Sequence, residues 1–184
     1  MKRFIVLTTI MLTAGLAHAQ TTLQHVRLSV EGTSTLHDWT VHSEDVSVVV
    51  YPNATTPELK LDSVLVRLPA TSLVSGKGAM DDLMHEALRA ERHATISFTA
   101  RDLTLAPTRA SGVQHAGVLT LAGRRGAQTV VYDVQRQGSV LRVNGRASVR
   151  MTRFGMEPPT AVFGTIRTGD DVTVRFEVDV PMTQ

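Results

Sequence analysis

The sequence predicts an all-β fold, an eight-stranded antiparallel barrel with one amphipathic α-helix. The two clearest observations are the segments 141–151 and 172–180, along which apolar and polar residues alternate. A period of two places one face of a strand in the interior and the other in water. The third observation is that helical spacing occurs in only one segment, residues 80–88. Closing such strands into a barrel removes the exposed edges of an open sheet.

Six further segments complete the predicted set of strands. They cover residues 25–30, 37–51, 59–68, 96–105, 113–121 and 130–135. In the second of them the buried phase changes, because Trp39 and Val41 are odd-numbered whereas Val46 and Val48 are even-numbered. A bulge or a tight bend is therefore expected near residues 43–45.

The helical segment has five apolar residues on one face. They follow the i, i+3, i+4, i+7, i+8 spacing and are Met80, Leu83, Met84, Ala87 and Leu88. Asp81 and Asp82 fall in the first turn, where the helix dipole favours acidic side chains. We expect this helix to cross one end or one side of the barrel.

The first 19 residues have the parts of a secretory signal peptide. Lys2 and Arg3 form a basic start, residues 4–16 are mostly apolar, and residues 17–19 (Ala-His-Ala) match a small-x-small cleavage site. The apolar stretch is shorter than the about 20 residues that cross a bilayer, which argues against a retained anchor. We expect cleavage after Ala19 and export to the periplasm or the medium, with residues 20–184 forming one barrel domain.

Charge and cysteine content exclude several classes of partner. The chain has 19 Lys and Arg against 17 Asp and Glu, and two of the basic residues lie in the predicted signal peptide. The remaining chain is formally neutral, so the pI of about 9.4 does not indicate nucleic-acid binding. The absence of cysteine excludes disulfides and a lipid-modified cysteine, so the fold rests on burial alone. We expect no nucleic-acid partner and no stable membrane insertion.

The interior of the barrel is the main functional question. A barrel of this size is either filled by its own side chains or has room for one small ligand. The inward faces are mostly Val, Leu and Ala, and the chain has only eight aromatic residues, one of them in the predicted signal peptide. These small side chains favour an interior with free volume.

Eleven residues are candidates for the lining of a ligand site. They are Trp39, Val41, Leu68, Met80, Leu83, Met84, Leu88, Phe98, Phe154, Met156 and Phe163. Trp39 is either a wall of the cavity or a plug that closes the barrel. The methionine-bearing helix is either an adaptable lid or an ordinary helix packed on the barrel. The loop that carries Phe154 and Phe163 either gates the cavity or inserts its side chains into the core.

The histidines allow a catalytic or metal-binding alternative. His37, Asp38 and His42 lie close together, and Ser34 precedes them. On a strand, however, His37 and His42 would face opposite sides. The chain also lacks the H-E-x-x-H, G-x-S-x-G and Cys/His patterns. We expect no enzymatic activity, no cofactor and no metal, and we expect His37 with Asp38 to fix the turn before Trp39.

Several motifs, in order along the chain, resemble the YceI family. They are Gly-Thr-Ser-Thr-Leu-His-Asp-Trp at 32–39, Ser-Leu-Val-Ser-Gly at 72–76, the Met80–Leu88 helix pattern, His-Ala-Thr-Ile-x-Phe at 93–98, Gly-Val-Leu-Thr-Leu-x-Gly at 117–123 and Phe-Gly-Met-x-Pro-Pro-Thr at 154–160. The resemblance spans about residues 24–180. It implies an exported, lipocalin-like antiparallel barrel that binds a polyisoprenoid or another long-chain amphiphile.

One departure from the family pattern leaves the ligand open. Residues 75–79 read Ser-Gly-Lys-Gly-Ala, whereas the resemblance to the isoprenoid binders would imply a charged stretch at this position. The favoured hypothesis is a carrier or sequestering protein for such a lipid. The alternatives are an envelope stress or interaction protein with a packed barrel and no ligand, and a hydrolase or metalloprotein that uses the His37 region. Homodimerisation through the outer faces of the strands stays open.

Overall fold

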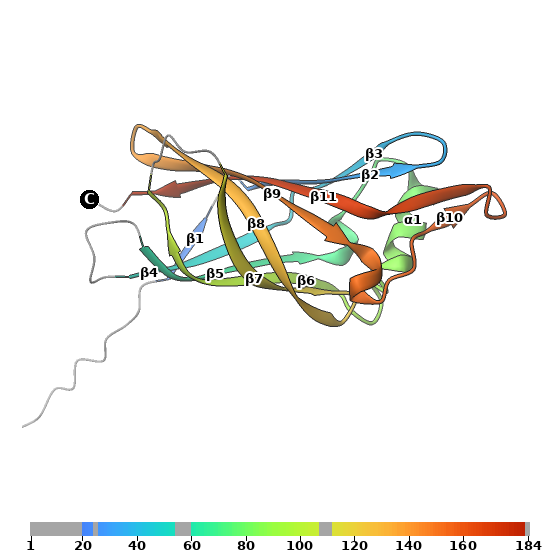
Figure 1. Cartoon of the computed structure of the whole chain (residues 1–184), viewed down its shortest axis with the longest axis horizontal. Coiled ribbons are helices and arrows are strands. Elements are labelled where there is room, and N and C mark those ends of the chain that lie inside the picture. Colours follow the sequence, from blue (N-terminus) through green and yellow to red (C-terminus); the bar gives the residue numbers. More distant parts are fainter. Residues whose placement is uncertain (1–19, 24–25, 54–59, 107–111, 183–184) are drawn as a thin grey trace, which may run out of the picture.

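The computed structural model describes residues 20–23, 26–53, 60–106 and 112–182 (Figure 1). The predicted signal peptide lies outside these residues, as do residues 25 and 59 at the starts of two predicted strands. None of the helices in the described part of the chain combines the length and the apolar character that a membrane crossing requires.

The described part of the chain folds as one curled antiparallel sheet with a single α-helix. The strands are β1 (Thr21–Leu23), β2 (Arg27–Ser34), β3 (Trp39–Ser43), β4 (Ser47–Pro52), β5 (Lys60–Pro69), β6 (Thr95–Thr104), β7 (Val113–Leu121), β8 (Arg124–Gln137), β9 (Val140–Arg150), β10 (Thr160–Ala161) and β11 (Ile166–Pro181). The helix α1 covers Gly78–Ala87, and two 3-10 turns cover Ala70–Ser72 (η1) and Met151–Phe154 (η2). The strand order is β1-β4-β5-β6-β7-β8-β9-β11-β2-β3, and β10 pairs with β11 alone.

The two segments with the clearest alternation pair with each other. In the register of β9 and β11, Val149 lies opposite Val172 and Leu141 lies opposite Val180. These four side chains are buried. On the outer face, both guanidinium nitrogens Nε and Nη2 of Arg142 donate to the Asp179 carboxylate, at 2.8 and 2.9 Å. The predicted inside and outside of these strands are therefore confirmed.

The expected count of eight strands is too low. The predicted segment 37–51 divides into β3 and β4, which pair with different neighbours, β2 and β5. The phase change expected near residues 43–45 marks this division. Two short strands, β1 and β10, were not predicted, because each is too short to show an alternating pattern.

The ladder of strands does not close completely into a barrel. Within the described ranges, β3 pairs as a strand only with β2. On its other side His42 forms an isolated bridge with Val74, in which each backbone N–H donates to the other residue's carbonyl at 2.9 Å. The segment after η1 thus borders β3 on the side where β3 has no strand partner among the described residues.

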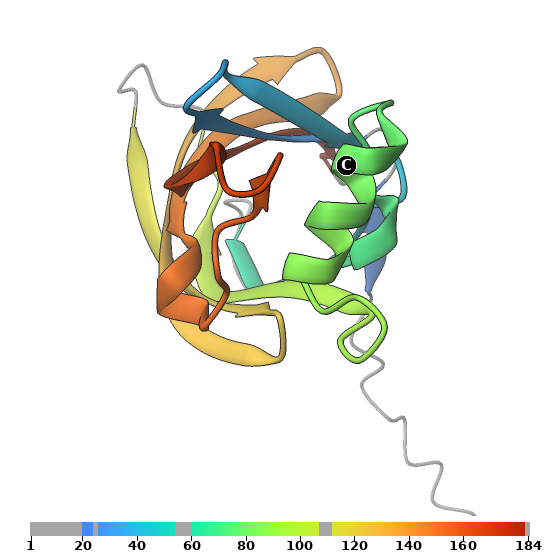
Figure 2. The ribbon, with the colours of Figure 1, turned by 90° about the vertical axis from the view of Figure 1, so that its right-hand side faces the viewer.

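Helix α1 lies at one end of the curled sheet (Figures 1 and 2). The Asp81 carboxylate accepts hydrogen bonds from the backbone N–H and the hydroxyl of Ser75, at 2.7 and 2.6 Å. The imidazole Nε2 of His85 donates to the carbonyl of Leu73 at 2.9 Å. These contacts fix the helix to the segment that precedes it and thereby set the position of its apolar face.

Candidate functional site

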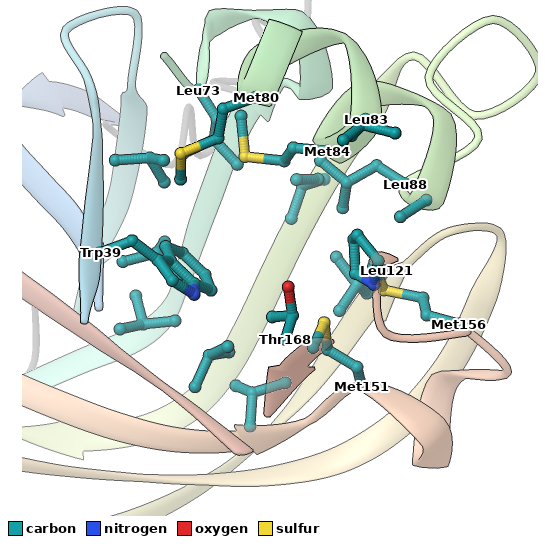
Figure 3. Close-up of a pocket in the computed structure, with 18 of the residues that line it drawn as sticks. Trp39, Leu73, Met80, Leu83, Met84, Leu88, Leu121, Met151, Met156 and Thr168 are labelled. Carbon is teal, nitrogen blue, oxygen red and sulfur yellow. The ribbon is translucent and has the colours of Figure 1, made fainter. Parts of the chain in front are cut away.

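An apolar cavity of about 420 Å³ lies at the end of the barrel where α1 contributes to its lining. Its walls come from β2, β3, β5, β6, β7, β9, β11, α1 and the segment 156–161 (Figure 3). A volume of this size lies within the range of about 300–1,000 Å³ that is usual for small-molecule sites. The preference for an interior with free volume is therefore correct for this end of the protein.

Helix α1 forms one wall of the cavity rather than packing on the outside of the barrel. Met80, Leu83 and Met84 line the cavity, and Figure 3 shows the two methionine side chains on the helix face that is turned to it. Leu88, just after the helix, is buried and completes this wall. Thioether side chains adapt to apolar surfaces of different shape, which suits a site for a flexible chain.

Aromatic rings line the walls because glycines on neighbouring strands leave room for them. The indole of Trp39 packs on Gly32, which lies directly opposite in the register of β2 and β3. A Cβ at Gly32 would overlap the indole. Rings that rest on the wall occupy less of the interior than rings that point inward, so glycine at this position keeps the cavity open.

Two more rings pack on glycines of a neighbouring strand, one on the glycine diagonal to it in register and one on the glycine directly opposite. The ring of Phe98 packs on Gly117 of β7, and the ring of Phe176 packs on Gly145 of β9. Phe98 faces both the outer cavity and a second, deeper cavity. Trp39 is thus a wall of the cavity, and its indole N–H donates to the carbonyl of Thr33 at 3.1 Å.

The second cavity has a volume of about 170 Å³ and lies beyond the first. The two cavities share six lining residues, Leu28, Val66, Phe98, Leu119, Val149 and Val174. An apolar cavity of about 150 Å³ in another protein stays dry and binds benzene, so this inner volume is sufficient for apolar groups. Leu61 and Val180 line this inner cavity, and together with Leu141 they belong to the buried core around it.

One polar side chain stands among the apolar walls of the inner cavity. Gln128 is 7% exposed, and its side-chain N–H₂ donates to the carbonyls of Thr129 and Ser148, at 3.0 and 2.9 Å. Its Oε1 has no hydrogen-bond partner among the residues that the structure describes. Tyr132 lines the same cavity, and burial raises the pKa of its hydroxyl above the ordinary value.

More polar side chains line the outer cavity than the inner one, although both are mainly apolar. Ser34, His37, Lys77 and Thr160 contribute to its lining. The hydroxyl of Thr168 points into the cavity from β11 (Figure 3). A ligand with an apolar chain and a polar head could therefore place its chain toward the inner cavity and its head among these groups.

Nine of the eleven predicted lining residues come together in the outer cavity. They are Trp39, Val41, Leu68, Met80, Leu83, Met84, Leu88, Phe98 and Met156. Phe154 and Phe163 do not line it. Phe154 is 1% exposed, and its ring packs 3.1 Å from where a Cβ on Gly126 would lie, so it belongs to the core. Phe163 is fully exposed at the turn between β10 and β11.

The sequence analysis missed two kinds of lining residue. Leu28, Leu119 and Val149 are inward-facing residues of strands, and alternation could have identified them. Ala161 and Ile166, which are paired in the β10–β11 hairpin, also line the cavity, so this hairpin contributes to its wall. That hairpin has only two residue pairs in register, too few to leave a periodic signal.

The residues of the catalytic alternative make other contacts. The hydroxyl of Ser34 donates to the backbone carbonyl of His37 at 2.7 Å and accepts from its backbone N–H at 3.1 Å. The imidazole Nδ1 of His37 donates to the carbonyl of Asp38 at 2.7 Å. These bonds shape the turn that leads to Trp39. Among residues 20–23, 26–53, 60–106 and 112–182, no three His, Cys, Asp or Glu side chains are grouped as metal ligands.

Solved structures share this fold at low sequence identity. BcnA of Burkholderia cenocepacia matches with a TM-score of 0.67 and 15% identity, over 84% of this chain and 96% of that chain. A polyisoprenoid-binding domain from Saccharophagus degradans, implicated in plant cell wall breakdown, matches with a TM-score of 0.66 and 15% identity, over 91% of this chain and all of that chain. A mutant of the Campylobacter jejuni YceI protein matches with a TM-score of 0.59 and 13% identity, over 98% and 94%.

A search of the curated proteins found no match. The family model of the YceI-like domain matches residues 13–180, which include the helix and all of the strands except the last residue of β11. The resemblance of the sequence motifs and the match of the family model agree. The chain therefore belongs to the YceI-like domain family.

Proposed function

We propose that this protein is an exported lipid-binding protein, a carrier or sequestering protein. Its cavity would hold one polyisoprenoid or another long-chain amphiphile. The observation that carries the proposal is the continuous set of apolar walls, in which a cavity of about 420 Å³ adjoins an inner cavity of about 170 Å³. The solved relative from Saccharophagus degradans, described as a polyisoprenoid-binding domain, supports this class of ligand.

Burial of the apolar chain supplies the binding free energy. Each methylene that leaves water contributes about 0.8 kcal/mol, so about ten buried carbons contribute roughly 8 kcal/mol. Lost freedom of the ligand and ordering of side chains offset several kcal/mol of this sum. No catalytic group is required, and we propose a binding role rather than an enzymatic one.

Two features support this proposal over a packed barrel that binds no ligand. A packed barrel requires side chains to fill the interior, whereas here Trp39 and Phe98 pack on wall glycines and leave the centre free. A packed barrel would also have no internal cavity for polar residues to line, whereas His37, Lys77 and Thr168 line one here. These groups would hold the polar head of the ligand near the opening.

Native mass spectrometry of protein purified without detergent tests the proposal. We expect a bound mass that organic extraction removes, and we expect the N-terminal residue to be Gln20 if the signal peptide is cleaved as predicted. Trp39 is the only tryptophan of the chain and lines the cavity, so its emission reports occupancy. Farnesol, palmitic acid or a longer prenol delivered from cyclodextrin should change this emission in a saturable way. An apo mass together with no response to any of these lipids would disprove the proposed function.

A further inference from the structure

Three large apolar side chains are exposed on two turns at the open end of the barrel. Leu36, in the turn between β2 and β3, is 65% exposed. Val162 is 61% exposed and Phe163 is fully exposed, and both lie in the turn between β10 and β11. Figure 1 shows both turns projecting at the end where α1 lies. We refer to these three side chains as the apolar rim.

The two turns are joined by hydrogen bonds through one threonine. The backbone N–H of Thr35 donates to the carbonyl of Arg167 at 3.0 Å, and its hydroxyl donates to the carbonyl of Thr165 at 3.2 Å. The same hydroxyl accepts from the backbone N–H of Arg167 at 3.1 Å. These hydrogen bonds fix the two turns relative to each other. Leu36 and Phe163 are therefore exposed together without any loose segment having to fold first.

The backbone of the second turn is strained. Val162 and Phe163 have φ values of 49° and 52°, in the left-handed region, and Gly164 follows with 83°. A β-branched residue in this region is a rare exception, and such strain is concentrated at functional sites. The turn is closed by hydrogen bonds from Gly164 N–H to Ala161 and from Thr165 N–H to Val162, both 3.1 Å. The fold thus holds two large apolar residues outward at a position that glycine or asparagine would occupy more easily.

The apolar rim is continuous with the mouth of the cavity. Leu36 itself belongs to the cavity lining, and so does Ala161, next to Val162. An amphiphile that enters between these turns would meet apolar surface from the rim to the inner wall. The rim consists of separate projecting tips rather than a flat face or a groove.

We propose that the apolar rim docks into the interfacial region of a lipid bilayer and places the mouth of the cavity against the membrane. This inference rests on the proposed lipid-binding function, because it names the source from which the ligand is taken. A bilayer accepts isolated apolar tips without a complementary pocket, whereas a protein partner would have to provide one for each tip. Aromatic and aliphatic side chains of this kind are typical of interfacial membrane contact.

Apolar contact, rather than charge, dominates this docking. Lys77 lines the mouth and Arg167 lies in the unit that joins the turns, but Asp38 follows Leu36 by only two residues. The guanidinium of Arg167 donates to the carbonyl of Gly164 at 3.2 Å. Charges of both signs occur near the rim, so we expect binding to zwitterionic as well as to anionic vesicles.

Vesicle flotation tests the inference with a matched control. The parent should float with phosphatidylcholine vesicles, and the double variant Val162→Ser/Phe163→Ser should partition at least tenfold more weakly. Leu36→Ser should show a smaller decrease. The control is Val118→Ser, which removes a 37% exposed valine from the outer wall of β7, and it should float like the parent. All variants are compared with the same N-terminus, verified by mass, so that residues 1–19 contribute equally.

Measurement of ligand uptake distinguishes an effect on membrane docking from an effect on ligand binding in the cavity. The double variant Val162→Ser/Phe163→Ser, whose two residues do not line the cavity, should take up farnesol from cyclodextrin, read by Trp39 emission, within twofold of the parent. A double variant that floats like the parent would overturn the inference, and so would a parent that ignores vesicles, which would favour a protein partner for the rim. A double variant that loses farnesol uptake in the absence of vesicles would also overturn it, because the rim would then act as part of the cavity. A parent that floats but takes up no lipid would disprove the proposed function while supporting the docking.

Discussion

Gly32 and Trp39 face each other across β2 and β3, and the indole rests on the glycine where any Cβ would overlap it. The pair determines how much of the outer cavity is free, because Trp39 is one of its walls. Gly32 is buried and its φ is not in the left-handed region. What this position requires is therefore the absence of a side chain, not the conformational freedom of glycine.

Gly32→Ala should push the indole of Trp39 into the cavity. We expect lipid binding to weaken by tenfold or more, since the added methyl displaces a large ring into the volume that the ligand needs. Overpacking of this kind costs about 1–3 kcal/mol of stability. Titration of farnesol or palmitic acid, followed by Trp39 emission and by native mass spectrometry, measures the effect.

Gly78→Ala is the matched control for that substitution. A Cβ at Gly78 meets no atom within 4 Å, and the residue lies in the first turn of α1 beside the cavity. This variant should bind lipid like the parent. If Gly32→Ala binds lipid as well as Gly78→Ala does, the glycine does not keep the cavity open.

Met84→Asp should abolish most lipid uptake by placing a carboxylate on the apolar wall that α1 provides. An unpaired charge that a bound alkyl chain would desolvate is strongly unfavourable. Met84→Leu keeps the apolar volume and should retain binding within a few-fold. Circular dichroism verifies that both variants fold. Equal uptake by the two variants would show that the ligand does not contact this face of the helix.

Phe154 and Phe163 should differ in their effect on stability although they lie in the same region of the sequence. Phe154→Ala removes a ring that is 1% exposed and should lower the free energy of unfolding by about 3–5 kcal/mol. Phe163→Ala changes an exposed side chain and should stay within about 0.5 kcal/mol of the parent. Urea denaturation measures both values. A strongly destabilised Phe163→Ala would contradict its exposed position.

The attachment of α1 should weaken at acidic pH, because it depends on the ionised carboxylate of Asp81. The hydroxyl of Ser75 donates to this carboxylate, and together with the Ser75 backbone N–H and the nearby His85 it holds the pKa of Asp81 below its ordinary value of 3.8. Because the folded-state pKa is the lower one, the stabilisation is present above the ordinary value and is lost as the pH falls through the folded-state pKa.

The variant Asp81→Asn isolates this contribution. We expect it to be less stable than the parent at neutral pH and to equal the parent once the pH is below the folded-state pKa of Asp81. The difference between the two thermal unfolding temperatures, followed across the acid range, measures the effect. The contribution of Asp170 cancels in this difference, because the hydroxyl of Thr152 lowers the pKa of Asp170 in both proteins. A difference that is constant with pH would exclude Asp81 as its source.

A bound lipid should stabilise the fold by mass action. Lipid at 100 times its Kd should add about 2.7 kcal/mol to the free energy of unfolding. For a domain of this size the unfolding temperature should rise by roughly 5–10 °C. Calorimetry of extracted and reloaded protein measures this shift, with Met84→Asp as the variant that should not respond. An unchanged transition in the reloaded parent would contradict binding inside the cavity.

Local patterns in the sequence determined the strands, the helix and most of the walls. Alternation along 141–151 and 172–180 sets which side chains of β9 and β11 are buried, because a strand has a period of two. Helical spacing likewise placed Met80 and Met84 on the face that lines the cavity. The phase change near residue 44 marked the bend at which β3 ends and β4 takes other neighbours.

Only the tertiary structure decided where the loop aromatics and the free volume lie. Gly155, with a φ of 65°, reverses the chain after η2 and leaves Phe154 in the core, whereas the β10–β11 hairpin projects Phe163 into solvent. No periodic pattern distinguishes the two phenylalanines. The open interior likewise depends on Trp39 and Phe98 packing on glycines of neighbouring strands. Such pairs are set by strand register across the sheet, a non-local property that one strand's own sequence does not specify.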